Sequence, residues 1–193
     1  MTSALLIMDV QQSVAESVGP DLLDRAAEAL AAARDTGIPV VFVRVAFRSG
    51  FPEISPANRT FSAVVSTAGD RFAEESPSTQ IHPAVAPRPG EPIVVKKRVS
   101  AFTGSDLEVL LRSMNADHLV LTGIATSGVV LSTLREAADR DYRLTVLADA
   151  CADRDDEVHR VLVEKVFPRQ AAVITTAEWV TSLGSRAAPR ASG

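Results

Sequence analysis

The sequence predicts a three-layer α/β/α domain around a six-stranded, mostly parallel sheet. Apolar runs of strand length recur along the chain, and segments of helical period separate most of them. The apolar runs are continuous instead of alternating with polar residues, so both faces of the sheet should be covered by helices.

The six predicted strands are short and almost wholly apolar. They cover residues 4–8, 40–45, 93–95, 118–122, 144–147 and 172–175. Between the first two, the segment DLLDRAAEALAAARDTG has apolar residues every three or four positions and ends at Gly37, as an amphipathic helix does.

Local signals indicate where the later helices begin. The run S-D-L-E at Ser105 to Glu108 is a candidate capping box for the second helix, and the last helix is expected to start at Thr176. A helix is also expected from Ser127 to Arg140. The acidic run from Asp153 to Glu157 should open a helix toward Phe167, where carboxylates suit the N-terminal dipole.

One long stretch, residues 46–91, is rich in Pro, Ser, Arg and Gly and has no clear helix or strand of useful length. A loop of this length inside a compact domain usually carries function, so it is a candidate lid or recognition loop, with a surface excursion or a subunit contact as the alternative. We expect residues 1–183 to form one domain and residues 184–193 to be a disordered tail.

Composition narrows the class of ligand and compartment. The chain has 193 residues, 46% of them apolar, and a net charge of −4 with lysines and arginines spread along it, so a small molecule is expected as partner, with no nucleic acid and no membrane. The first apolar run is too short for a membrane span. The single cysteine, Cys151, excludes a disulfide within one chain and fits a cytoplasmic protein.

Polar residues with chemical potential follow three of the predicted strands, where ligands bind in open parallel sheets. Asp9 and Gln11 follow the first strand and Lys96 the third. The turn from Gly123 to Val130 follows the fourth and leads into a helix, whose first N–H groups could donate to a substrate oxygen. A lysine near the end of a buried strand needs a counter-charge, which Asp9 could supply, for structural or for acid/base purposes.

These three segments together resemble the motifs of the isochorismatase-like hydrolases. The matching residues are Asp9-x-Gln11, Lys96-x-Arg-x-Ser-Ala-Phe102 and Gly123-Ile-Ala-Thr126 before Val129-Val130, in the family's order. The resemblance implies a Rossmann-like α/β/α fold with a six-stranded, mostly parallel sheet, hydrolase activity without a cofactor, and assembly as a homodimer or homotetramer.

The resemblance also assigns roles within the site. It places Asp9 and Lys96 on the catalytic pair, the oxyanion-binding N–H groups at Ala125 and Val129, and a non-proline cis peptide between Ile124 and Ala125. The family's nucleophilic cysteine falls on Val129, which cannot form a thiolate.

The function expected from these residues is therefore Cys-independent acid/base hydrolysis of a small metabolite, with an enol ether of the isochorismate type favoured. Candidate substrate contacts are Gln11, Phe102, Thr126 and Ser127. Two alternatives stay open: a catalytically silent binding or assembly protein, and an amide hydrolase that uses Cys151 or Ser127 as nucleophile, although Ser127 is also placed as a helix cap.

A metal site is not expected. The three histidines, His82, His118 and His159, are scattered over the chain and fit structural or solvent-facing positions.

Overall fold

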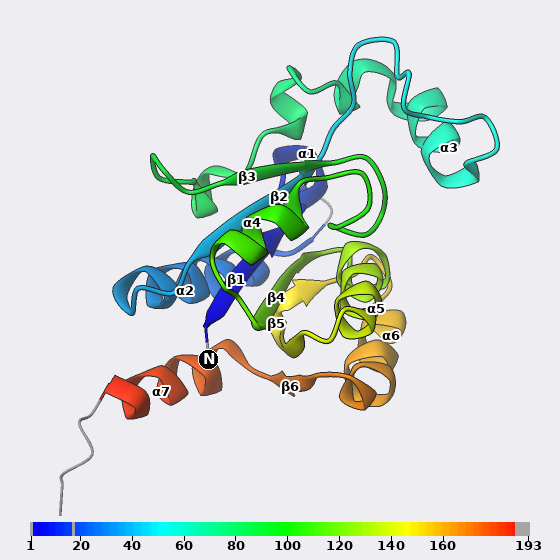
Figure 1. Cartoon of the computed structure of the whole chain (residues 1–193). Helices are drawn as coiled ribbons and strands as arrows, with labels where there is room; N and C mark the ends of the chain where they lie inside the picture. The colour runs from blue at the N-terminus through cyan, green and yellow to red at the C-terminus, as the bar shows by residue number, and fades with distance from the viewer. Residues whose placement is uncertain (1, 17, 188–193) are drawn as a thin grey trace, which may run out of the picture.

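The computed structural model describes residues 2–16 and 18–187, and these form a sheet of six strands in the order β3-β2-β1-β4-β5-β6 (Figure 1). Every neighbouring pair is parallel. The six predicted strands are all present: β1 Ser3–Met8, β2 Val40–Val45, β3 Ile93–Lys96, β4 His118–Ile124, β5 Arg143–Ala152 and β6 Ala172–Ile174. Their ends differ from the prediction by at most two residues, except that β5 continues five residues beyond its predicted end at Leu147.

Helices cover both faces of the sheet, as the continuous apolar strands predict. The residues of β1 alternate between the two layers: Leu5 and Ile7 pack with α2 (Pro20–Asp35) and α7 (Thr176–Ala187). Ala4, Leu6 and Met8 face the other layer. That layer consists of α4 (Leu107–Ser113), α5 (Leu131–Asp139) and the continuation of α6 (Asp156–Val161) through Leu162–Val166 and Phe167–Arg169.

Residues 46–91 contain a helix that the sequence analysis did not predict. Helix α3 spans Arg59–Ala68 and lies beyond the end of the sheet at which β1 leads into α1 (Gln12–Ala15) (Figure 1). The Asn58 side chain accepts a hydrogen bond from the Phe61 N–H at 3.1 Å, and the Phe61 ring packs edge-on against Phe47. The sequence did not predict this helix because its β-branched and hydroxyl residues have low helix propensity. The Asn58 cap and the buried Phe61 ring stabilise it in the structure.

Short turns of 3₁₀ helix complete the 46–91 segment at Gly69–Phe72, Pro77–Thr79 and Pro83–Val85. The expectation that this segment lacks a helix of useful length is therefore wrong for α3 alone.

Two predicted helix ends also differ. The capping box does not form. The Ser105 hydroxyl accepts from the Leu107 N–H at 3.2 Å, but the Glu108 carboxylate pairs with Arg112 and Arg140 instead of accepting from the Ser105 N–H. Helix α7 starts at Thr176 as predicted and continues to Ala187, four residues into the predicted tail, because the first proline after Leu183 is Pro189. Residues 188–193 of that tail lie outside the described part of the chain.

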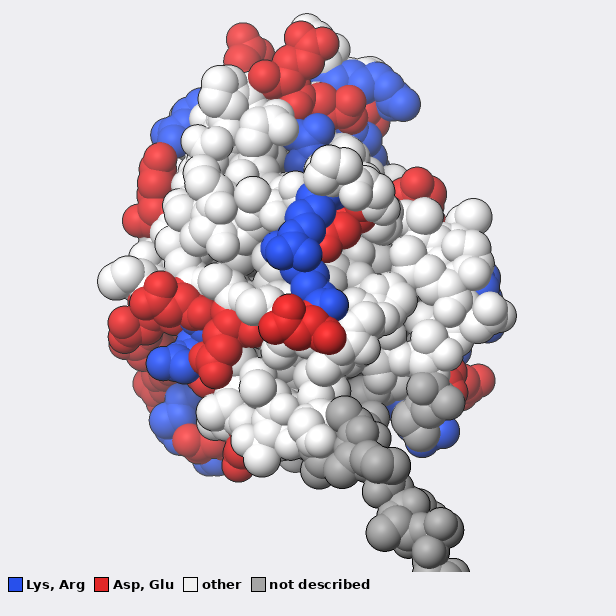
Figure 2. Space-filling view, turned by 90° about the vertical axis from the view of Figure 1, so that its left-hand side faces the viewer, with Lys and Arg blue, Asp and Glu red and all other residues white. Residues whose placement is uncertain are grey.

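Charged side chains of both signs are interspersed with wide uncharged areas on the face shown in Figure 2. Among residues 2–16 and 18–187, no helix has both the length and the apolar character needed to cross a bilayer.

Candidate active site

The central strands β1 and β4 are direct neighbours, and the chain leaves them in opposite directions across the sheet. Strand order reverses at this point, which is where ligands bind in open parallel sheets. Gly123 near the end of β4 has φ 143°, and a β-carbon there would lie 2.1 Å from the carbonyl oxygen of Met8. Only glycine therefore lets the two strands approach so closely where Asp9 and the turn after β4 emerge.

Asp9 and Lys96 form a buried ion pair at this edge. Asp9 follows β1 with a left-handed φ of 54°, and its Oδ2 lies 2.9 Å from Lys96 Nζ. Lys96 is on β3, two strands from β1, so its stem carries the ammonium past the end of β2. The ammonium also donates to the carbonyls of Arg98 at 3.0 Å and Val99 at 3.1 Å, which fills its three donor positions.

The carboxyl of Asp9 sits in an unusual environment. The Asp9 residue is 6% exposed and its Oδ1 has no hydrogen-bond partner among the described residues. Burial raises the pKa of Asp9 above its ordinary value. The charge of Lys96, its hydrogen bond and the nearby Val45 N–H only partly oppose that rise in the pKa. Asp9 therefore has one oxygen held by a cation and one free to carry a proton.

The turn after β4 departs from the single helix predicted from Ser127 to Arg140. The Ile124–Ala125 peptide bond is cis, as the family resemblance implied. Residues Thr126–Val130 then form a distorted turn with non-helical angles at Gly128, and the regular helix α5 begins only at Leu131. The N–H groups of Gly128 and Val130 both donate to the Ala125 carbonyl.

Two residues outside the predicted site hold this turn. The Ser127 N–H donates to Asp153 Oδ2 at 2.7 Å, and Thr126 Oγ1 lies 2.8 Å from His159 Nδ1. Sequence analysis placed Asp153 at the start of a helix and His159 among residues in structural or solvent-facing positions. The helix start is instead capped by Asp155, whose carboxylate accepts from two N–H groups of α6.

Gln11 has a structural role in this arrangement. It is fully buried, its amide nitrogen donates to the carbonyls of Val45 and Thr79, and its oxygen accepts from the Val45 N–H at 2.9 Å. Both amide donors are used, so the predicted substrate contact has no donor left in this conformation.

Phe102 is buried in the apolar cluster on the α5 side of the sheet. Its ring stacks against Tyr142 with centroids 6.0 Å apart, and the Arg140 guanidinium lies 4.8 Å from its centre. Arg140 and Tyr142 follow the C-terminus of α5, the end of the helix that is farther from the turn at Thr126. Phe102 therefore belongs to the core between α5 and the loop after β3, and its role as a substrate contact stays a prediction.

Val129 and Cys151 both belong to the buried apolar cluster on the α5 side of the sheet. Burial raises the pKa of the Cys151 thiol to about 12, so it is uncharged at neutral pH. Ser127 is exposed, and its backbone is tied to Asp153.

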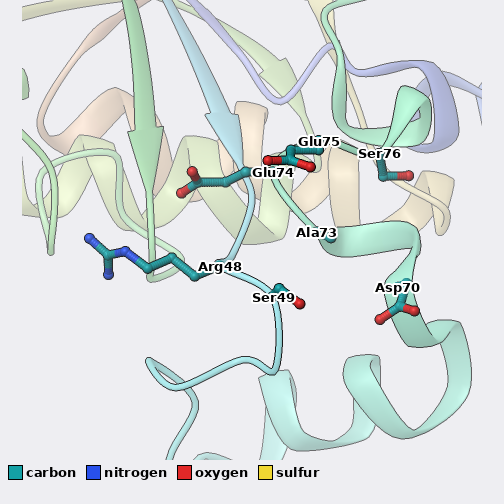
Figure 3. A pocket seen from close by; sticks show the side chains of 7 residues that line it. All are labelled: Arg48, Ser49, Asp70, Ala73, Glu74, Glu75 and Ser76. Atoms are coloured by element: carbon teal, nitrogen blue, oxygen red, sulfur yellow. The ribbon is translucent and has the colours of Figure 1, made fainter.

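A separate cavity of about 520 Å³ lies within the 46–91 segment (Figure 3). Arg48, Ser49, Asp70 and the run from Ala73 to Ser76 line it, and the carboxylates of Glu74 and Glu75 lie along one side of it. Asp9 and Lys96 do not line this cavity. With exposures of 6% and 2%, these two residues are almost closed off from solvent. In the part of the chain described, no three His, Cys, Asp or Glu residues are grouped to hold a metal ion.

Comparison with known proteins shows what the whole chain is similar to. The isochorismatase domain model matches residues 3–178. The chain is 28% identical over 188 residues to the isochorismatase family protein YecD of Escherichia coli O157:H7, covering 94% of this chain and 96% of YecD. It is 33% identical over 170 residues to the ureidoacrylate amidohydrolase RutB of Variovorax paradoxus strain S110, covering 77% of this chain and 68% of RutB.

The chain belongs to the isochorismatase family. The fold agrees: the structure of an isochorismatase family protein from Burkholderia thailandensis superposes with a TM-score of 0.83 at 27% identity, over 95% of this chain and 96% of that one. This member of the isochorismatase family is a hydrolase, and its substrate is not fixed by family membership.

Proposed function

We propose that this isochorismatase-family hydrolase cleaves a small vinyl ether of the isochorismate type by acid/base chemistry, without a covalent intermediate. The observation that carries the proposal is the Asp9 carboxyl: Oδ2 is held by Lys96, Oδ1 is buried without a partner, and burial raises its pKa. A carboxyl whose pKa is raised in this way is better suited to act as a general acid than an exposed one.

The steps of the reaction follow from that arrangement. Lys96 binds Oδ2 of Asp9, so the proton resides on Oδ1 and is given to the terminal carbon of the vinyl ether. The resulting oxocarbenium ion is attacked by water, whose released proton returns to Asp9. The hemiketal then breaks its C–O bond and yields a ketone and an alcohol, with one water consumed.

The absence of a thiolate supports this chemistry over amide cleavage through an acyl-enzyme. We assign Val129 to the family's nucleophile position, and the chain's single thiol, Cys151, is buried with a raised pKa. Amide hydrolysis is the second candidate, because RutB is an amidohydrolase and is 33% identical to this chain. In that case water activated at Asp9 would replace the thiol. We also propose that the protein acts in the cytoplasm, as a homodimer or homotetramer and without a cofactor.

The decisive experiment measures turnover of isochorismate, and of a panel of small vinyl ethers and N-carbamoyl amides, by mass spectrometry. Four proteins are compared: the parent, Asp9→Asn, Lys96→Ala and Asp149→Asn. Asp149 is a matched control, because it also lies at the carboxyl edge of the sheet but caps α7 through Thr176. Circular dichroism confirms that each variant is folded.

Vinyl-ether turnover that is lost in Asp9→Asn and Lys96→Ala but kept in Asp149→Asn supports the proposal. Turnover that survives in Asp9→Asn contradicts the role of the general acid, and cleavage of amides alone favours the second candidate. If the parent turns over no compound of the panel, the proposed function is contradicted and the alternative of a binding or assembly protein is favoured.

A further inference from the structure

Two side chains that follow β5 reach across to the turn that follows β4. Asp153 binds the backbone of Ser127 and His159 binds the hydroxyl of Thr126, so two consecutive residues of the turn are held by groups 26 and 33 positions later in the sequence. The remaining turn between the cis peptide at Ile124–Ala125 and Val130 is distorted at Gly128. Its shape therefore depends on these external contacts as well as on its own hydrogen bonds.

The contact of Asp153 is that of a carboxylate. Burial acts to raise the pKa of Asp153, but hydrogen bonds from Ser127 and from the N–H groups of Arg154 and Asp155 outweigh it and lower the pKa. The separation of 2.7 Å from the Ser127 nitrogen to Oδ2 is in the range of a charge-assisted hydrogen bond. Asp153 is thus a fixed negative charge that directs the Ser127 N–H toward itself.

The contact of His159 satisfies a buried group. Thr126 is fully buried, and a buried hydroxyl without a partner is costly. His159 lies on α6, one turn after the Asp155 cap, and its Nδ1 is 2.8 Å from Thr126 Oγ1. Movement of α6 would therefore be transmitted to the turn.

We infer that Asp153 and His159 are positioning residues that set the geometry of the turn from Ala125 to Val130. The inference rests on the proposed function only to the extent that this turn contacts the substrate. The Ser127 N–H donates to Asp153, and the N–H groups of Gly128 and Val130 donate to the Ala125 carbonyl. These three N–H groups are therefore not available to donate a hydrogen bond to a substrate.

The first experiment needs no substrate. Amide hydrogen exchange and ¹H–¹⁵N chemical shifts of residues 125–130 are measured in the parent, Asp153→Ala, Asp153→Asn and Asp155→Ala. Asp155 is the matched control: it lies two residues away and caps α6, but it has no hydrogen bond to the turn.

In Asp153→Ala, exchange of the Ser127 amide is expected to accelerate by at least about tenfold and its proton shift to move upfield, as for loss of one charge-assisted hydrogen bond. Asp153→Asn, which keeps an acceptor oxygen, should restore most of the protection. Asp155→Ala should speed exchange at the start of α6 and affect Ser127 much less than Asp153→Ala does, because any effect on the turn must pass through the His159 contact. Equal effects of Asp153→Ala and Asp155→Ala at Ser127 would overturn the role of Asp153.

The role of His159 is tested by His159→Gln and His159→Ala, with Arg160→Ala as the control on the exposed side of the same helix. His159→Ala should shift the amides of residues 125–128, and His159→Gln should shift them less because its amide can still bond the Thr126 hydroxyl. Unchanged amides in His159→Ala would contradict the inference for this residue.

Kinetics separate positioning from the chemistry at Asp9. With a substrate found as described above, Asp153→Ala and His159→Ala are expected to lower kcat by about 100-fold with KM nearly constant. The pH profile set by Asp9 should keep its midpoint. A changed midpoint would mean that these residues act on Asp9 instead. If the parent turns over nothing, the proposed function fails, and the exchange experiment still decides whether the turn is positioned by this pair.

Discussion

Lys96 Nζ and Asp9 Oδ2 are 2.9 Å apart, and their side chains are 2% and 8% exposed, so the pair joins β3 to β1 almost without contact with solvent. Such a pair is costly to break, because removing one partner leaves the other charge buried. The predictions below start from this pair.

Replacing Asp9 by Asn isolates the pH dependence of its carboxyl. Because burial raises the pKa of Asp9 in the folded state, the folded protein binds more protons than the unfolded chain at pH values above the unfolded pKa, near 3.8. The stability of the parent relative to Asp9→Asn should therefore fall with rising pH, by about 1.4 kcal/mol per unit until the folded pKa is passed. Urea unfolding at a series of pH values measures this difference, in which the other carboxylates cancel. A difference that grows with pH would show that the pKa is lowered.

Replacing Lys96 by Met should lower the free energy of unfolding by about 3–5 kcal/mol near pH 8. The loss arises because Asp9 keeps its burial without a cation and two backbone carbonyls lose their donor. Lys97→Met is the control, since Lys97 pairs with the partly exposed Glu74. Chemical denaturation should show a smaller decrease in the free energy of unfolding for Lys97→Met. Equal decreases for the two variants would mean that the buried Asp9–Lys96 pair stabilises the fold no more than the partly exposed Lys97–Glu74 pair does.

Cys151 should be inert in the folded protein. With a pKa of about 12 and 4% exposure, its thiol has almost no thiolate at pH 8. Iodoacetamide labelling followed by mass spectrometry should proceed only after unfolding, and Cys151→Ala should retain any activity that is found. Rapid labelling of the native protein, or loss of activity in Cys151→Ala, would revive the thiol mechanism.

Gln11 is expected to hold the 46–91 segment to the sheet. Gln11→Leu leaves the Val45 N–H and the carbonyls of Val45 and Thr79 without their partner, at a cost of about 3 kcal/mol. Limited proteolysis should then cut within residues 46–91 sooner than in the parent. The exposed Gln80 gives a control variant, Gln80→Leu, for which both stability and cleavage should change little.

Gly123→Ala should be strongly destabilising, by about 3 kcal/mol or more, because its β-carbon would overlap the Met8 carbonyl between β1 and β4. Gly184→Ala in α7 has open space around it and should instead add about 0.5–1 kcal/mol. Thermal unfolding compares the two variants. A mild effect at Gly123 would show that the central strands can separate slightly without loss.

Sequence analysis predicted the features that depend on local pattern. All six strands followed from continuous apolar runs, and the Asp9–Lys96 pairing followed from the need of a buried ammonium for a counter-charge. Helix α3 was missed because a cap and one buried ring outweigh its poor propensity. A turn-binding Asp153 and a structural Gln11 were missed for another reason: their partners lie 26 to 68 residues away, and no local pattern encodes them.

The central position of β1 has a consequence for how the chain acquires its structure. Its neighbour β4 begins at His118, and the Thr2 N–H bonds the Asp117 side chain across 115 residues. During synthesis, the edge of Ser3–Met8 that pairs with β4 therefore stays uncovered until the chain has been made past His118. Long-range parallel pairing of this kind folds slowly and exposes a strand edge meanwhile. Refolding yield should accordingly depend on protein concentration more steeply than for a domain of the same size built from local hairpins or helices.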